Sequence, residues 1–81
     1  MSASDLLAFS RWLDEQVLAG NLKVPQAITT AASPGVILAI AEQQGFVLTA
    51  EELREASRQL SASYWPWAGK GHGWRRAFFN G

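Results

Sequence analysis

Apolar residues in the first twenty positions recur at intervals of three and four, which is the spacing of one face of an α-helix. These residues are Leu6, Phe9, Leu13 and Val17. Ser4 is a suitable N-cap in front of them, and Gly20 is a natural stop after them. The pattern predicts a first helix that buries these four side chains. No stretch before Ser61 alternates apolar and polar residues, so we expect no strand there.

The segment from Ser33 to Phe46 carries the signals of a helix with defined ends. Ser33 is a suitable N-cap, and Pro34 suits the first helical position because its missing N–H costs nothing there. Gly45 supplies the left-handed residue that closes a helix after Gln44. Phe46 stands where this capping motif places an apolar contact on the last turn. The sequence therefore predicts a helix from Pro34 to Gln44 and a short, packed turn.

A further helix is signalled directly afterwards. Thr49, with Glu52 three residues later, forms the pattern of a capping box. Acidic residues fall at the positive end of this helix, and Arg54 and Arg58 lie toward its other end. We expect its buried stripe to consist of Leu53, Ala56 and Leu60.

A weaker helical segment lies between the first helix and Ser33. Pro25 biases Val24 away from the helical region, which places the start of this helix at Pro25 and its end at Ala32. Its expected buried face is Ile28, with Ala27 and Ala31 beside it. The fold class predicted for the chain is all-α, a small bundle of three to four short helices with an irregular aromatic C-terminal segment.

The composition changes near residues 61–63. The chain has no net charge, but residues 1–60 carry −3, and the following residues carry +3 and most of the aromatic side chains. We therefore divide the chain into a helical domain at 1–62 and a tail rich in Trp, Arg and Gly at 63–81. Glycines at 69, 71 and 73 make a pliant connector. We expect no regular element of any length in the tail, with at most a helical turn from Trp74 to Phe79.

Two of these runs resemble a known family. The run AEQQGF at residues 41–46 and the run TAEEL at 49–53 resemble the nitrogen-fixation-associated leader domain, here called the Nif-eleven family. The run LLAF at residues 6–9 is similar to the opening helix of that family. The resemblance covers roughly residues 5–60. It implies a helical domain found either as the leader of ribosomally made, enzymatically modified peptides or as a small stand-alone protein, often cyanobacterial.

The resemblance implies no catalytic residues, and the residues themselves offer little for catalysis. The lone His72 lies in the glycine-rich connector without an acid in the tail to orient it. Glu51, Glu52 and Glu55 are explained by capping and helix solubility. With one histidine and no cysteine, we expect no metal site and no cofactor. Three cations beside an acidic body disfavour nucleic acid as a partner.

Two interpretations of function follow. The first is a non-catalytic interaction module whose C-terminal segment docks on a larger protein or assembly. The second is a precursor, with residues up to about 60 as leader, the rest as substrate, and a peptide-modifying enzyme as partner. The chain departs from the usual precursor pattern because it lacks a Gly-Gly or Gly-Ala pair at the leader end and has no cysteine for thioether rings.

The aromatic residues of the tail divide into two groups on either side of the connector. We expect the first group to pack on the body, and we expect the second group to reach outward and bind the partner, because Trp and Arg are enriched at binding hot spots. The first group is Tyr64, Trp65 and Trp67; the second is Trp74, Arg75, Arg76, Phe78 and Phe79. A basic N-terminal signal and an 18-residue apolar run are both absent, so we expect a cytoplasmic protein.

Overall fold

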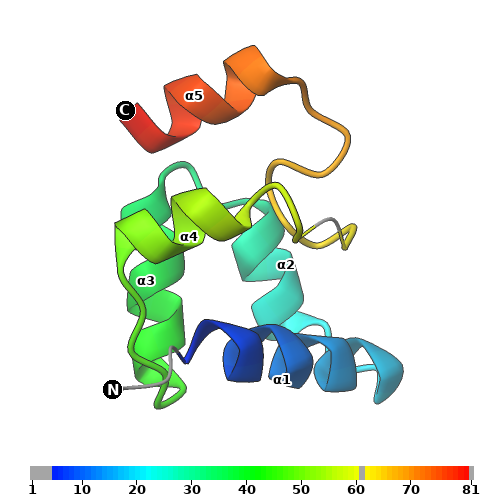
Figure 1. The fold of residues 1–81 in the computed structure, drawn as a ribbon. Coiled ribbons are helices and arrows are strands. Elements are labelled where there is room, and N and C mark those ends of the chain that lie inside the picture. The colour runs from blue at the N-terminus through cyan, green and yellow to red at the C-terminus, as the bar shows by residue number, and fades with distance from the viewer. Residues whose placement is uncertain (1–4, 61, 81) are drawn as a thin grey trace.

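The computed structural model describes residues 5–60 and 62–80, and every regular element in them is a helix. Five helices follow one another along the chain (Figure 1). They are α1 (Leu6–Leu18), α2 (Lys23–Thr29), α3 (Pro34–Gln43), α4 (Ala50–Ala56) and α5 (His72–Asn80). The all-α class is confirmed.

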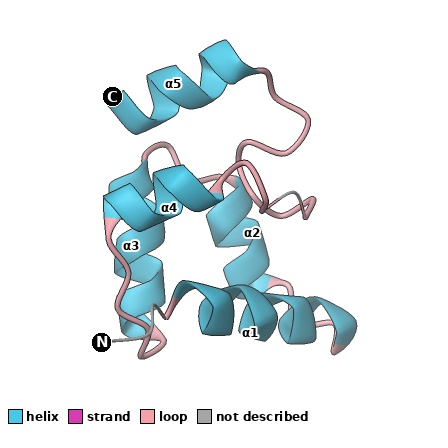
Figure 2. Cartoon of the chain, in the orientation of Figure 1, coloured by secondary structure: helices cyan, strands magenta, loops and turns pink. Residues whose placement is uncertain are grey.

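Each of the first four helices packs against its neighbour in the sequence, α1 on α2, α2 on α3 and α3 on α4. Turns and loops join them, and the longest lies between α4 and α5 (Figure 2). In Figure 1, α2 and α3 stand upright between α1 below and α4 above, and α5 lies across the top of the molecule. The C-terminal helix is therefore set at the end of the molecule away from α1.

Glycines with positive φ close two of the helices. Gly20 (φ 81°) follows α1, and Gly45 (φ 89°) follows α3. After α3, the N–H of Gly45 bonds the carbonyl of Glu42, and the N–H of Phe46 bonds the carbonyl of Ala41 at 2.9 Å. This pair of bonds is the Schellman motif, which satisfies carbonyls at the helix end. Phe46 then packs on Phe9, with ring centroids 5.3 Å apart, and so joins the turn to α1.

The helices α3 and α4 begin directly after the N-cap residues that the sequence predicts, Ser33 and Thr49. Thr49 and Glu52 form the reciprocal capping box: Glu52 N donates to Thr49 Oγ1 at 3.1 Å and Thr49 N donates to Glu52 Oε1 at 3.0 Å. Ser33 is extended at the N-cap of α3, and Pro34 is the first helical residue. The Ser33 side chain makes no capping hydrogen bond, so its backbone conformation and Pro34 define this helix start.

Three sequence-based expectations for the body are wrong in detail. Val17 is 41% exposed, because the face of α1 that meets the other helices ends at Leu13. The second helix starts at Lys23 instead of Pro25. Pro25 is tolerated because it falls in the first turn, where no intrahelical N–H donor is required. The same helix ends at Thr29, three residues earlier than expected.

The fourth helix ends earlier than its apolar stripe indicates. Of the three expected core positions, Leu53 is fully buried, but Ala56 and Leu60 are only half-buried. Ser57 Oγ donates to the carbonyl of Arg54 at 2.7 Å, and turns follow from residue 57 to 59. Side-chain capture of a backbone carbonyl competes with helix continuation. The chain therefore leaves α4 before Leu60 reaches the core.

The expectation that the tail lacks a regular element is also wrong, because α5 has nine residues. Gly73 lowers its intrinsic helix propensity. Packing of Phe78 and Phe79 on Trp67 compensates for this cost, with ring centroids 6.2 and 5.6 Å from that of Trp67. Tertiary contact commonly outweighs propensity in short helices.

The hydrophobic core runs through the compositional change near residues 61–63. Its members include Phe9 and Leu13 from α1, Ile28 from α2, Ile37 from α3 and Leu53 from α4, all fully buried. Trp65, at 1% exposure, is buried in the same cluster. The proximal part of the tail is thus a structural part of the helical body.

Candidate functional site

The proximal tail is anchored to the body by hydrogen bonds as well as by packing. Thr29 Oγ1 on α2 donates to the carbonyl of Tyr64 at 2.7 Å. The Tyr64 hydroxyl donates to Asp14 Oδ1 at 2.7 Å and lies 3.2 Å from the carbonyl of Ser10, both on α1. Trp67 Nε1 donates to the carbonyl of Leu60 at 2.5 Å. Tyr64, Trp65 and Trp67 are all buried.

Burial raises the pKa of Tyr64 to about 12, and its hydrogen bond to Asp14 acts in the same direction. Both effects disfavour the phenolate, because it has less solvent around it and faces a carboxylate. The hydroxyl consequently stays protonated and remains a donor throughout the physiological range.

A continuous series of aromatic contacts links α1 to α5. Phe9 meets Trp65 edge to face at 6.4 Å, and Trp65 stacks on Trp67 with ring centroids 5.0 Å apart and planes 8° apart. Trp67 contacts Phe78, which stacks on Trp74 at 5.1 Å. Stacked and edge-to-face pairs stabilise beyond the area they bury. The position of α5 therefore depends on Trp67.

The five distal residues expected to reach outward are divided between two environments. Phe78 is 8% exposed and Phe79 is half-buried, so the expectation that both reach outward is wrong. The reason is that α5 turns these two rings onto Trp67. Trp74 is 37% exposed, Arg75 is half-buried and Arg76 is exposed. Of these five residues, Trp74 and Arg76 are thus accessible to another molecule, and Arg75 is accessible in part.

The exposed side of Trp74 is next to a further cation. Lys70 Nζ lies 5.9 Å from the centroid of the Trp74 ring, within the range of a cation–π contact. Lys70 belongs to the segment between Gly69, where φ is positive at 74°, and the start of α5. Lys70 and Trp74 thus form an exposed pair of a cation and an aromatic ring at the start of α5.

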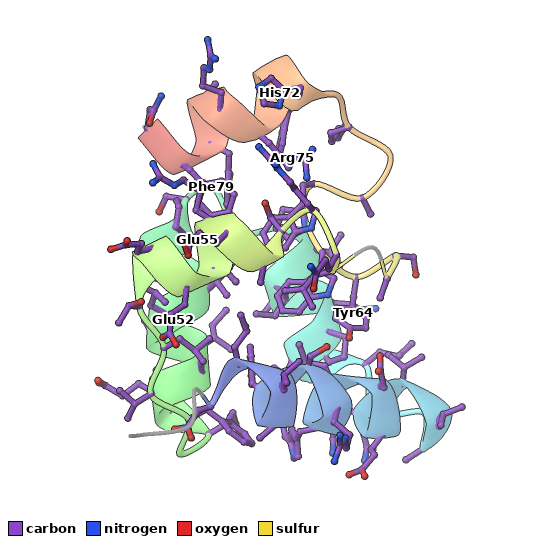
Figure 3. The ribbon with its side chains drawn as sticks, viewed as in Figure 1. Glu52, Glu55, Tyr64, His72, Arg75 and Phe79 are labelled. Atoms are coloured by element: carbon purple, nitrogen blue, oxygen red, sulfur yellow. The ribbon has the colours of Figure 1, made fainter. Side chains whose placement is uncertain are left out.

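A cleft of about 560 Å³ separates α5 from α4. Its walls carry two arginines from each side: Arg54 and Arg58 from α4 and the turn after it, and Arg75 and Arg76 from α5. Arg75 and Phe79 extend from α5 toward α4 (Figure 3). Glu55 is the acidic residue in this lining. We call this space the arginine cleft.

Charge in the arginine cleft is not neutralised within the described part of the chain. None of its four guanidinium groups makes an ion pair within 4.0 Å or a side-chain hydrogen bond with residues 5–60 and 62–80. An arginine keeps its charge at all physiological pH values. The cleft is therefore a locally basic region in a chain with no net charge.

The other candidate chemistry is dispersed. Glu52 is engaged in the capping box of α4, and His72 lies at the start of α5 on the rim of the cleft. Within residues 5–60 and 62–80, no three His, Asp or Glu side chains gather as a metal ion would require.

The sequence predicted Arg75 and Arg76 as binding residues but assigned Arg54 and Arg58 only to the end of a helix. Their proximity to α5 depends on how the chain returns over α4 after the turns at 62–70, and helical periodicity carries no information on that path. Four of the five arginines lie between residues 54 and 76, and this clustering is the only sequence signal that points to a shared site.

Comparison with family models, with curated proteins and with solved structures found no match for this chain. Within the described residues, no helix has both the length and the apolar character that crossing a membrane requires.

Proposed function

We propose that this chain is a small, non-catalytic helical interaction module that docks on a larger protein or assembly through its C-terminal helix. The observation that carries the proposal is that the last turn of α5 is attached to the body while its first turns stay accessible. Phe78 and Phe79 attach the helix to Trp67. One turn earlier, Trp74 and Arg76 are exposed and Arg75 is half-buried. Trp and Arg are the side chains most often found at interface hot spots.

The resemblance to the Nif-eleven family supports the body of this module. The family-like runs at residues 41–46 and 49–53 coincide with the Schellman motif after α3 and the capping box of α4. A stand-alone member of that family is the setting we favour. In a precursor, cleavage near residue 60 would remove Tyr64, Trp65 and Trp67 from the core that they share with the helices.

The test is capture of a partner by the tagged full-length chain from extracts of the cells in which it is native. Trp74→Ala, and separately Arg75→Ala with Arg76→Ala, are expected to lose a protein that the unmodified chain retains. Leu18→Ala is the matched control for Trp74, because Leu18 is an 87% exposed apolar side chain on α1. Arg11→Ala with Lys23→Ala is the control for the arginine pair, since both side chains are exposed and lie outside the arginine cleft.

Equal capture by all four variants would overturn the proposal. The intact mass of the chain from the same cells separates the two settings. An unmodified, full-length mass is expected for the module. A cleaved or mass-shifted C-terminal segment would instead support the precursor.

A further inference from the structure

We propose that the arginine cleft binds an acidic segment of the docking partner, with carboxylate side chains bridging α4 and α5. This inference rests on the proposed function and deepens it, because it assigns a chemistry to the partner and a second contact surface beside Trp74.

The two walls of the arginine cleft carry like charge. Arg54 and Arg58 on one side, and Arg75 with Arg76 on the other, line one space of about 560 Å³. Cations that face one another across a cleft repel, and Glu55 offsets only part of this charge. A ligand with negative charge between the walls would convert this repulsion into attraction on both sides.

The donor groups of the cleft have a geometry that suits carboxylates. Guanidinium groups are planar and present paired N–H donors that match the two oxygens of a carboxylate. Four such groups without ion-pair partners among the described residues can accept more than one carboxylate at once. The cleft is also within the range of volumes that hold a ligand in proteins.

The acidic residues in and beside the cleft favour an acidic peptide over a nucleic acid. Glu55 lies among the arginines, and a smaller adjoining space is lined by Glu51 with Arg54 and Phe79. These carboxylates would repel a continuous row of phosphates. A peptide can space its carboxylates around them and place an apolar side chain on the Phe79 ring, which lines both spaces. The combination of arginines, an acid and an aromatic ring therefore favours a peptide.

The experiment measures fluorescence anisotropy of a short labelled peptide that alternates glutamate with leucine, added to the full-length chain. A peptide with glutamine in place of glutamate is the control ligand. We expect the glutamate peptide to bind and the glutamine peptide not to bind. The affinity for the glutamate peptide should fall when NaCl is raised from about 0.1 M to about 1 M, because the Debye screening length shortens from about 10 Å to about 3 Å.

Charge reversal on each wall tests the position of the site. Arg54→Glu with Arg58→Glu, and separately Arg75→Glu with Arg76→Glu, are each expected to weaken binding by about tenfold or more, as for hot-spot arginines. Arg11→Glu with Lys23→Glu changes the net charge equally outside the cleft and is expected to leave binding unchanged. Circular dichroism verifies that each variant keeps its helices.

Several results would overturn the inference: equal binding of the glutamine peptide, an equal effect of the control pair, or tighter binding of a single-stranded uridine oligomer than of the glutamate peptide. Loss of binding in the variants of only one wall would also contradict a bridge between α4 and α5.

If the peptide fails to bind but Trp74→Ala still abolishes capture of the partner, the inference fails and the proposed function stands. If the peptide binds but the full-length chain captures no partner, the cleft binds acidic peptides and the proposed function fails.

Discussion

The Tyr64 hydroxyl donates a hydrogen bond to Asp14 Oδ1 at 2.7 Å, which joins two residues fifty positions apart. This bond attaches the proximal tail to α1 and aligns the segment that leads to Trp65 and Trp67. The packing of the tail is thus supported by a polar contact at the edge of the core. Its strength can be measured directly.

Tyr64→Phe is expected to lower the free energy of unfolding by about 1 kcal/mol, the usual net value of a hydrogen bond. Asp14→Ala is expected to cost a similar amount. The double variant should cost clearly less than the sum of the two, because both single changes remove the same contact. Urea denaturation measures all three. Strict additivity would show that the two side chains do not interact in solution.

The ionisation of Tyr64 predicts a loss of stability at high pH. Its pKa is about 12 in the folded chain against 10.0 for the free side chain. As pH rises above 10, the unfolded chain loses the phenolic proton first, so the unfolded state binds fewer protons and stability falls. The stabilising contribution is complete below pH 10 and disappears as pH approaches 12.

Absorbance near the tyrosinate band measures this ionisation without ambiguity, because Tyr64 is the only tyrosine in the chain. The expected midpoint is near pH 12, and urea unfolding of Tyr64→Phe should depend less on pH between 10 and 12. A midpoint near pH 10 in the folded chain would contradict the burial and the contact with Asp14.

Local signals predicted much of the body and the inward packing of Tyr64, Trp65 and Trp67, but not the helix that follows them. The ends of α3 and α4 follow from single residues with strong preferences, such as Gly45 and Thr49, whose partners lie within a few positions. The arginine cleft and the burial of Phe78 depend on where the chain after residue 60 crosses α4. That path is determined by long-range contacts of Trp65 and Trp67. Trp74 and Phe78 do have helical spacing, but Gly73 and the glycines before it lower the intrinsic helix propensity, so tertiary packing on Trp67 decides whether α5 forms.

Two glycines should respond in opposite ways to the same substitution. Gly45 has φ 89°, and a Cβ there would meet no heavy atom within 4 Å, so the cost of Gly45→Ala is conformational and should be about 1 kcal/mol. Gly73 lies inside α5 without a positive φ and with equally open space. Gly73→Ala should therefore stabilise α5, by about 0.5 to 1 kcal/mol.

Denaturant midpoints test the glycine pair, and each variant serves as the control for the other. Equal midpoints for Gly45→Ala and the unmodified chain would contradict the left-handed turn after α3. A destabilising Gly73→Ala would show that residue 73 is not helical in solution.

Two truncations should separate the contribution of the proximal tail from that of α5. A chain that ends at residue 62 loses Tyr64, Trp65, Trp67 and Phe78 from the core. Removal of a single large aromatic residue from a core costs about 3 to 5 kcal/mol. The total stability of a chain of this size is about 4 to 12 kcal/mol. This truncation is therefore expected to abolish cooperative unfolding and to expose apolar surface to a hydrophobic dye.

A chain that ends at Gly69 keeps the proximal rings and the hydrogen bonds of Tyr64 and Trp67. It loses only α5, whose contact with the body is concentrated on Trp67. Removing Phe78 from the core and exposing one face of the Trp67 ring should cost about 3 to 5 kcal/mol, the range for the loss of one large aromatic residue. We expect this chain to remain helical and to unfold cooperatively at a lower denaturant midpoint. If the chain that ends at residue 62 unfolds with the midpoint of the full-length protein, the proximal tail is not part of the core in solution, because no domain this small can lose four buried aromatic residues without a loss of stability.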